Sequence, residues 1–559
     1  MLVKFGQILT WVILMFLYTS CIGQEKRTVG LLCYDKEKSF DGLNLIFPRG
    51  AANVYLLNNC GEIVHTWLDS SKTGPNQSAY LQKDGSIFIA KGIEPDTAIQ
   101  FNNGNEKIEH RDWGNNLLWS FTYSDSLVKC HHDFKILPNG NVLLISWEVK
   151  AKREAIDAGR KSSLLPRERI ISEQIVEVKP TGKYTGEIVW EWHAWNHLVQ
   201  DNDSTLKNYG NVKMHPELID FNYKTYSTKD DWLHFNAIDY DKQKDLILLS
   251  VPAFNEIWII DHSTTSVQAA SHSGGRFNRG GDLIWRWGNP EAYRSGDSTQ
   301  KKLFFQHNAH WVKNEVGSKN QACESIILFN NLYPDSASSV CLITPVFNSS
   351  LNAFAKWDSI FLPETYDWTY TSKQRGKMFS PIGSSAQVLP NGNLLICSGK
   401  NGYVFEVDDK SNIVWEYVVP TKMGAPVKQG TIIKPSDNRT FRTERYPMNW
   451  LNSGDMLLSA QWPLEIFADT AFCNSLHYFD YLETRTGVYI YWNQNARQIS
   501  IAPLRFSETP IKFTIKNSLG KTAHDGVLNN PVKVKIDTWE TGWYGVYVEE
   551  KLVTSFINE

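Results

Sequence analysis

The stretch LPNGNVLLIS at residues 137–146 returns almost unchanged as LPNGNLLICS at residues 389–398. Each copy opens with a turn, where Asn and Gly readily take the positive φ values that tight turns need. The apolar run that follows is typical of a strand that is buried on both faces. Further copies are QKDGSIFIA at 82–90, LNSGDMLLSA at 451–460, and the weaker DKQKDLILLS at 241–250 and KNQACESIILFN at 319–330. The chain therefore repeats one unit of a turn and a buried strand.

A second repeated phrase is a strand that ends in aromatic residues. Its copies are GEIVHTW at 61–67, NNLLWSF at 115–121, GEIVWEWHAW at 186–195, GDLIWRWGNP at 281–290 and SNIVWEYVVP at 411–420. Sheets that recur along a chain with insertions between them are typical of a β-propeller. We therefore expect an all-β fold with a six-bladed β-propeller over residues 24–485, seven blades being the alternative. Residues 486–559 lack both phrases, and their short strands predict a small C-terminal β-sandwich.

The composition supports a large core and excludes one class of partner. Of the 559 residues, 42% are hydrophobic and 21 are Trp, a residue that suits pleated surfaces. Many of the tryptophans end the second phrase, so we expect them to pack the blades. The formal net charge of −3 provides no basic excess for a phosphate backbone, so no nucleic-acid partner is expected.

The first residues are typical of an export signal. Lys4 precedes an apolar run at 8–18 that is too short to span a bilayer, and small residues lead up to Gly23. We expect a signal peptide at residues 1–23, with lipidation at Cys21 and an uncleaved anchor as alternatives. The protein would then be exported to the extracellular medium or the cell surface, or otherwise to the periplasm.

Export permits disulfides, and the chain has eight cysteines, none of them in a C-x-x-C pair. The spacing therefore predicts neither a zinc cluster nor a dithiol redox centre. Cys33 with Cys60 and Cys323 with Cys341 are the pairs closest in sequence. Buried free thiols are equally compatible with several sites, such as Cys397 in its apolar strand.

Histidines gather where three buried strands begin, in CHHDF at 130–134, DWLHFN at 231–236 and QHNAHW at 306–311. In a propeller, the segment that enters the innermost strand of each blade faces the central channel, so these segments would converge. Histidine can act there as a nucleophile, a general acid or base, or a metal ligand. The candidate catalytic residues are His132, His234, His307 and His310. His131 is expected to point away, because neighbours on a strand face opposite sides.

Aromatic residues flank the histidine segments. Trp232 and Trp311 are expected to form walls for a planar substrate, with ordinary blade packing as the alternative. Histidines in the outer-strand phrases, such as His197, are expected to be structural. No metal ion and no cofactor is expected.

Several blocks of sequence resemble the bacterial arylsulfate sulfotransferases. They are residues 130–148, 231–265, 280–293, 303–311, 379–407, 412–420 and 440–447. The resemblance covers about residues 45–450 and implies a six-bladed propeller. It also implies transfer of a sulfuryl group from a phenolic sulfate ester to a phenol acceptor. The route would pass through a sulfohistidine intermediate, without a nucleotide sulfate donor.

The resemblance implies that His234 and His307 are active-site histidines, with Asn308 or His310 as a further donor. It also implies a nucleophilic His in a later blade and an Arg after the QH segment. The matching stretches, FSPIGSSAQ at 379–387 and LFNNLYPDSASSV at 328–340, contain neither. The nucleophile would then be one of the four candidate histidines.

The substitutes considered for the missing Arg are Arg442 and Arg445, with Arg375 less favoured. A propeller that binds sulfated aromatic or glycan ligands without catalysis is the alternative function. A quinone- or metal-dependent oxidoreductase is a third hypothesis.

The C-terminal segment resembles the sorting domain of the type IX secretion pathway of Bacteroidetes. The matching stretches are residues 513–530, 535–539 and 542–559. This resemblance implies that the secretion machinery is a partner, besides the aryl sulfate donor and the phenolic acceptor. A carbohydrate- or partner-binding sandwich is the alternative, and a homodimer also stays open.

Overall fold

The computed structural model describes residues 27–69, 75–93, 106–225, 230–312, 325–334, 337–373, 375–451, 460, 462–466, 488–493, 498–503, 511–528, 532–536 and 538–558. The predicted signal peptide and most of the repeat copy at 451–460 lie outside these residues, as do Cys21, Cys323 and Cys473.

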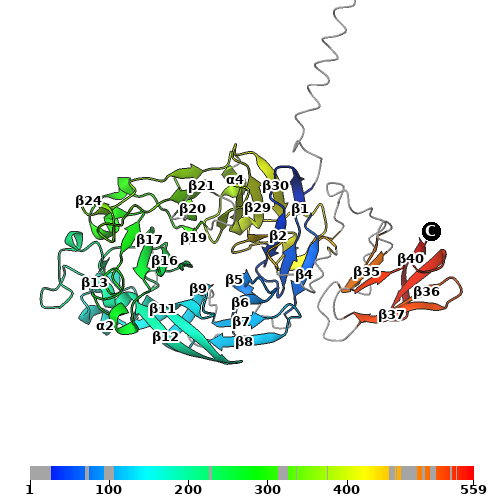
Figure 1. The fold of residues 1–559 in the computed structure, drawn as a ribbon, viewed down its shortest axis with the longest axis horizontal. Coiled ribbons are helices and arrows are strands. Elements are labelled where there is room, and N and C mark those ends of the chain that lie inside the picture. The colour runs from blue at the N-terminus through cyan, green and yellow to red at the C-terminus, as the bar shows by residue number, and fades with distance from the viewer. Residues whose placement is uncertain are drawn as a thin grey trace, which may run out of the picture.

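Within these ranges, six antiparallel sheets of four or five strands follow one another along the chain around a common centre (Figure 1). Sheet 1 contains β33 (Glu444–Pro447), β2 (Gly42–Ile46), β3 (Val54–Leu57) and β4 (Ile63–Trp67). Sheet 2 contains β5 (Pro75–Leu81), β6 (Ile87–Lys91), β7 (Lys107–Arg111) and β8 (Leu117–Thr122). Sheet 3 contains β9 (Val128–Ile136), β10 (Val142–Ala151), β11 (Arg169–Gly182) and β12 (Thr185–His193).

The other three sheets continue the series. Sheet 4 contains β15 (Ala237–Asp241), β16 (Leu246–Val251), β17 (Glu256–Asp261) and β18 (Trp285–Trp287). Sheet 5 contains β19 (His307–Trp311), β20 (Ile326–Tyr333), β21 (Ala337–Ile343) and β26 (Trp368–Tyr370). Sheet 6 contains β27 (Ser385–Val388), β28 (Leu394–Ser398), β29 (Tyr403–Val407), β30 (Ile413–Val418) and β1 (Gly30–Tyr34). The all-β prediction is confirmed, and we interpret the sheets as blades of a β-propeller.

Two long-range pairings close the ring. β1 adds to the outer edge of sheet 6 by pairing with β30, and β33 supplies the innermost strand of sheet 1 by pairing with β2. In Figure 1 the blue strands β1 and β2 accordingly lie beside the yellow β29 and β30.

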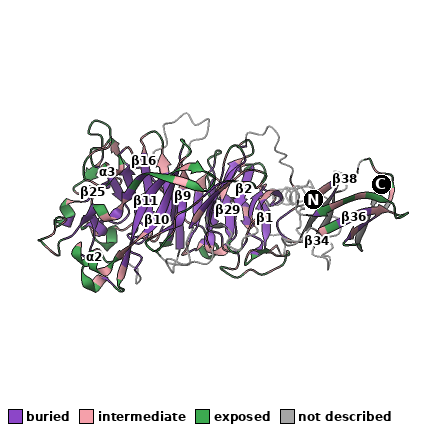
Figure 2. Ribbon diagram, turned by 90° about the horizontal axis from the view of Figure 1, so that it is seen from below, coloured by how far each residue is buried: buried purple, intermediate pink, exposed green. Residues whose placement is uncertain are grey.

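A hydrophobic cluster lies at each contact between neighbouring sheets. The strands that follow the predicted turns, β6, β16 and β28, are buried along their whole length. The predicted double burial of these strands is therefore confirmed. Figure 2 shows the purple of buried residues around β10, β11 and β29 as well.

The repeated tryptophans join sheets 1, 2, 3, 4 and 6 to the next sheet of the ring. The indole Nε1 of Trp67 in sheet 1 donates to the Asp112 carbonyl beside sheet 2, at 3.2 Å. Trp119 continues the pattern with the Thr185 carbonyl at 3.0 Å, and Trp415 in sheet 6 returns to Asn59 of sheet 1 at 2.7 Å. Trp192 and Trp285 make the equivalent bonds from sheets 3 and 4. The predicted packing role of the outer-strand tryptophans is confirmed.

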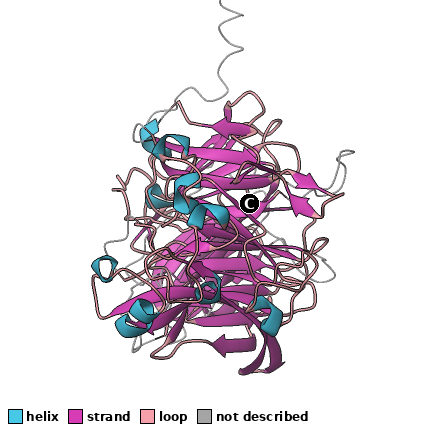
Figure 3. Cartoon of the chain, turned by 90° about the vertical axis from the view of Figure 1, so that its left-hand side faces the viewer, coloured by secondary structure: helices cyan, strands magenta, loops and turns pink. Residues whose placement is uncertain are grey.

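The remaining elements are short, and strands dominate the view in Figure 3. The helices are α2 (Lys152–Asp157), α3 (Ser266–Ala269), α4 (Arg375–Met378), η1 (Ser162–Leu164), η2 (Ala194–His197), η3 (Val212–Met214), η4 (Pro290–Tyr293), η5 (Ser298–Gln300) and η6 (Gly399–Asn401). Two-stranded sheets join β13 (Leu198–Val199) to β14 (Ile219–Asp220), β22 (Phe347–Asn348) to β23 (Ala353–Phe354), β24 (Lys356–Trp357) to β25 (Ile360–Phe361), and β31 (Thr421–Lys422) to β32 (Ala425–Pro426). None of the helices in the described ranges has the length and hydropathy of a membrane span.

Two further sheets lie in the segment for which a sandwich is expected. One contains β34 (Val488–Asn493), β35 (Gln498–Pro503) and β38 (Val532–Lys535). The other contains β37 (Thr522–Leu528), β36 (Ile511–Asn517), β39 (Gly542–Val548) and β40 (Lys551–Asn558). Residues of both sheets, such as Ile501 and Phe513, share one hydrophobic core.

The cysteines divide into two groups. Cys33 and Cys60 are disulfide-bonded, whereas Cys130, Cys341 and Cys397 are buried free thiols. Burial raises the pKa of the Cys397 thiol to about 12, so this residue serves as an apolar packing group.

Candidate functional site

Three of the predicted histidines meet near the starts of the innermost strands of sheets 3, 4 and 5. His132 lies in β9, His234 lies three residues before β15, and His307 is the first residue of β19. The ring centroids of His132 and His234 are 4.7 Å apart. Phe441, just ahead of β33, lies 6.0 Å from His132 and 5.9 Å from His307 between ring centroids. We call His132, His234 and His307 the histidine cluster.

An unusual backbone shapes this cluster. His132, His234 and Asn308 have φ values of 54°, 57° and 57°, a left-handed region that few residues other than Gly adopt. The pairing of β9 with β10 and of β19 with β20 also shifts register at these points. Bulges of this kind re-aim side chains, and local strain is concentrated at functional sites. The strand starts are therefore shaped to present these rings.

The proton on His307 is fixed by its neighbour Asn331. The Asn331 amide nitrogen donates to the carbonyls of Ser380 and Gly383 at 2.8 and 2.9 Å, so its Oδ1 is the atom that faces His307 Nδ1 at 2.8 Å. Nδ1 therefore carries the proton, and Nε2 keeps its lone pair. Burial lowers the pKa of His307 to about 3, so the ring is neutral near pH 7.

His234 forms a dyad with Asp231. Its Nδ1 lies 2.5 Å from Asp231 Oδ2, and its side chain is 22% exposed, more than the buried rings of His132 and His307. The carboxylate accepts the Nδ1 proton, which makes Nε2 the nitrogen that can exchange a proton with a ligand. Sequence reasoning missed Asp231, although the D-x-x-H spacing in DWLH was a usable signal.

His132 belongs to a buried proton chain. Its Nδ1 lies 2.7 Å from His131 Nδ1, and His131 Nε2 lies 2.8 Å from Glu173 Oε2. His131 therefore does not point away from His132, contrary to the prediction. Burial lowers the pKa of both rings and raises the pKa of Glu173. The charge of Glu173 therefore decides, through His131, which nitrogen of His132 carries the proton. The proton on His307 does not depend on Glu173, because Asn331 fixes it at Nδ1.

Arg439, which sequence reasoning did not consider, is a cation whose charge acts on the cluster. Its charge acts on both His132 and His307. Burial lowers its pKa to about 10, so it stays charged at neutral pH. Among the described residues no carboxylate forms an ion pair with it. Arg439 can therefore neutralise an anion held against the histidines.

The two predicted arginines have other partners. The Arg442 guanidinium lies 2.9 Å from Asp133 Oδ2 and donates to Tyr80 Oη at 2.5 Å. Arg445 is 1% exposed, pairs with Glu406, and donates to Asn44 Oδ1 at 2.7 Å. These bonds join innermost strands to neighbouring strands, so both arginines have a structural role.

The two predicted aromatic walls lie in the core instead. Trp232 is 2% exposed and packs against Phe221 and Phe254 between sheets 3 and 4. Trp311 is 9% exposed and packs between sheets 4 and 5. Blade packing, the alternative weighed for both residues, describes their surroundings.

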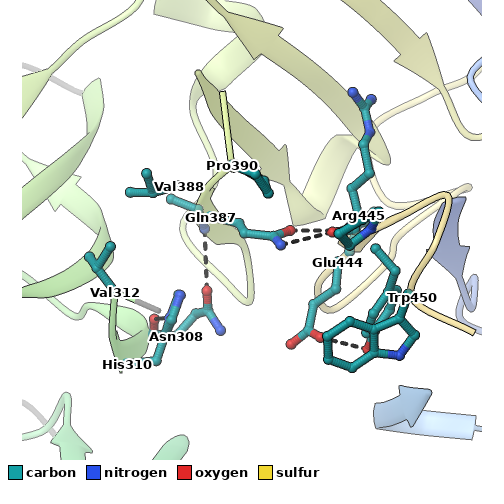
Figure 4. A pocket seen from close by; sticks show the side chains of 13 residues that line it. Asn308, His310, Val312, Gln387, Val388, Pro390, Glu444, Arg445 and Trp450 are labelled. Carbon is teal, nitrogen blue, oxygen red and sulfur yellow. Dashed lines mark hydrogen bonds between the residues drawn. The ribbon is translucent and has the colours of Figure 1, made fainter. Parts of the chain in front are cut away.

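His310 and Asn308 line a different pocket. It is lined by residues of β19, β27 and β33 and by Trp450 (Figure 4), and its lining residues do not include His132, His234 or His307. His310 Nδ1 contacts the Asn308 carbonyl at 2.9 Å, and the Ala386 amide donates to Asn308 Oδ1 at 3.3 Å. The Arg445 guanidinium is turned away from this pocket in Figure 4. The structure therefore separates His310 from the other three histidines.

Comparisons with known proteins give one family. A family model described as Arylsulfotransferase (ASST) matches residues 35–423, more than half of the chain. A search of curated proteins finds no match. The solved structures that match include a protein of unknown function from Bacteroides caccae, at 13% identity over 68% of this chain and 93% of that one, with a TM-score of 0.34. Another is the Pseudomonas aeruginosa periplasmic gluconolactonase PpgL, at 10% identity over 88% and 98%, with a TM-score of 0.33. These structural similarities are too low to carry an argument, and the family match stands on its own. The chain belongs to the arylsulfotransferase (ASST) family.

Proposed function

We propose that the protein moves a sulfuryl group from a phenolic sulfate ester to a phenol acceptor through a sulfohistidine at His307, without a nucleotide sulfate donor. The observation that carries this proposal is the state of His307. Its ring is neutral and its Nδ1 proton is held by Asn331, so Nε2 keeps its lone pair, and the charge of Arg439 acts on the ring. A neutral imidazole with a fixed lone pair can attack the sulfur of a sulfate ester, and Arg439, which has no carboxylate partner among the described residues, can balance the negative charge of that ester.

The donor step divides the work among three side chains. His307 Nε2 attacks sulfur with its lone pair, the bond from sulfur to the aryl oxygen breaks, and the aryl oxide leaves with the electron pair. His234, held as imidazolium by Asp231, gives its Nε2 proton to that oxygen. Arg439 stabilises the sulfuryl oxygens while charge shifts toward them.

The acceptor step reverses these roles. His234 Nε2 removes the proton of the incoming phenol, the phenol oxygen bonds to sulfur, and the bond between nitrogen and sulfur breaks to return the lone pair to His307. Phe305 and Phe441, whose ring centroids lie 6.0 and 5.9 Å from that of His307, provide the aromatic surfaces once expected from Trp232 and Trp311. The proposal also takes the six sheets as the six blades of the propeller, rather than a propeller of seven blades.

The later-blade segment favours a histidine of the cluster as the nucleophile. In FSPIGSSAQ at 379–387, Ser384 Oγ accepts from the Gly399 amide at 3.0 Å and Ser385 Oγ accepts from the Thr443 amide at 3.2 Å. Both hydroxyls are thus engaged in holding the backbone. The absence of a histidine there is also the observation that favours the alternative, a propeller that binds aryl sulfates without turning them over.

A comparison of two alanine variants tests the proposal. Purified protein is incubated with 4-nitrophenyl sulfate and a phenol acceptor, and release of nitrophenol is followed. His307→Ala should abolish the release, whereas His310→Ala, in the other pocket, should retain it. If the unmodified chain binds the donor but releases nothing with any acceptor, the binding function is correct and the transferase proposal is wrong.

We also propose that the chain is exported, through the predicted signal peptide and with the type IX secretion machinery as partner of residues 486–559. The disulfide-bonded Cys33 and Cys60 support export, because such bonds persist in oxidising compartments. Cell fractionation tests it: the mature chain should be found at the surface or in the medium, and a cytoplasmic chain would contradict it.

A further inference from the structure

A second group of ligand-type side chains lies at the outer strands of sheets 3 and 4, apart from the histidine cluster. His197 is in η2, directly after β12, and His272 and Asp282 lie between α3 and β18. One ligand atom from each of the three residues lies within 4.8 Å of the other two. His197 and Asp282 are buried, and the His272 side chain is 61% exposed.

The hydrogen bonds of His197 leave a lone pair that faces another acceptor. Its Nε2 lies 2.9 Å from the Ala269 carbonyl, which can only accept, so Nε2 carries a proton. Its Nδ1 lies 2.8 Å from Asp282 Oδ1, and His272 Nδ1 approaches the same oxygen at 2.7 Å. The 2.8 Å separation between Nδ1 and the carboxylate oxygen therefore requires a proton between these two acceptor atoms. A metal ion that binds both atoms would take the place of that proton.

The ring of His197 is held firmly in this orientation. Trp192 stacks parallel to it at 5.5 Å between centroids and donates its indole N–H to the Gly281 carbonyl at 2.7 Å. A Cβ on Gly281 would lie 2.7 Å from His197 Nε2 and 2.1 Å from the Ala269 carbonyl oxygen. A histidine that donates its far nitrogen to a backbone carbonyl has the arrangement typical of a metal ligand. The packing thus fixes Nδ1 toward Asp282.

We propose that His197 Nδ1, His272 Nδ1 and Asp282 Oδ1 bind a divalent transition metal ion of the zinc type. Two imidazoles and one carboxylate suit Zn²⁺ or Co²⁺, whereas Ca²⁺ and Mg²⁺ prefer oxygen ligands alone. A cavity lined by His272, Trp195 and Leu198 adjoins the group, so water can fill a fourth tetrahedral position. The ion would join η2 of sheet 3 to the loop ahead of β18 in sheet 4.

Zinc binding by the full chain tests this site independently of sulfuryl transfer. After removal of metal with a chelator, Zn²⁺ binding is measured by titration calorimetry, and Co²⁺ binding by the visible absorption of the tetrahedral ion. The informative variant is His272→Ala, because its exposed side chain can be removed without disturbing the core. His193→Ala is the matched control. The His193 ring lies 3.3 and 3.7 Å from the carboxylates of Glu148 and Glu191, but it belongs to no such three-residue group within the described ranges.

The unmodified chain and His193→Ala should each bind one Zn²⁺ with equal affinity. His272→Ala should bind it at least tenfold more weakly and lose the Co²⁺ absorption. Two results would overturn the proposal: no Zn²⁺ binding by the unmodified chain, in which case a hydrogen bond between His197 and Asp282 accounts for the geometry, or equal binding by His272→Ala.

Discussion

Replacing Asp231 by Asn removes the negative charge that stabilises the His234 imidazolium, while the side chain keeps almost the same size. The His234 Nδ1 and Asp231 Oδ2 atoms are 2.5 Å apart. For charge centres roughly 4 Å apart and an effective dielectric constant of 20, their interaction amounts to about 4 kcal/mol. Each 1.36 kcal/mol corresponds to a factor of ten in rate, so loss of this interaction lowers proton transfer about a thousandfold.

The assay is a single turnover of the donor half-reaction without acceptor, with the released phenol measured. Phenyl sulfate should show the full loss in Asp231→Asn, because its leaving oxygen needs the proton most. A donor with a more acidic phenol, such as 4-nitrophenyl sulfate, should show a smaller loss. Asp245→Asn is the control, since Asp245 Oδ1 makes a similar contact of 2.8 Å to His262 Nδ1 away from the cluster. Equal losses with both donors, or a loss below threefold with phenyl sulfate, would refute the role given to His234.

Three further predictions concern charge, pH and packing. Arg439→Gln should slow the donor half-reaction about 10²- to 10³-fold, as removal of one transition-state donor does. Arg375→Gln, at an exposed side chain, should leave the rate unchanged. Equal rates for the two variants would contradict the role of Arg439. Burial lowers the pKa of His65 to about 4, below its unfolded value of about 6.5, so its contribution to stability is complete above pH 6.5 and is lost as pH falls toward 4. Urea unfolding should therefore show a smaller loss of stability between pH 7 and pH 5 for His65→Gln than for the unmodified chain, and equal losses would contradict this. Trp415→Phe should lower the free energy of unfolding by about 1–3 kcal/mol, because it leaves a buried carbonyl without its donor. Trp357→Phe, at a side chain 73% exposed, should change it by less than about 0.5 kcal/mol. Equal melting temperatures of the two variants in calorimetry would contradict this.

The fold was predictable because its signals are local. A turn, a buried strand and a strand that ends in Trp recur along the chain, and each follows from a few neighbouring residues. The closure of the ring is different. The pairing of β33 with β2 joins residues about 400 positions apart, and no pattern within either strand indicates it.

The candidate site was predictable only in part, for a similar reason. The histidines at three strand starts were visible in the sequence, and the structure brings three of them together. Which arginine lacks an ion pair within the described part of the chain depends on carboxylates from other sheets. Asp133 pairs with Arg442 and Glu406 pairs with Arg445, whereas Arg439 has no such partner there. The left-handed backbone at His132 and His234 likewise has no signal in the sequence, although it directs the rings.

The central claim is that His307 carries the sulfuryl group. The direct measurement is incubation with an aryl sulfate donor alone, followed by peptide mass spectrometry under alkaline conditions that preserve the bond between nitrogen and sulfur. We predict one sulfuryl group on His307 in the unmodified chain and in His310→Ala, and its loss when a phenol acceptor is added. A sulfuryl group on His132 or His234, or acceptor-dependent turnover by His307→Ala, would contradict the account.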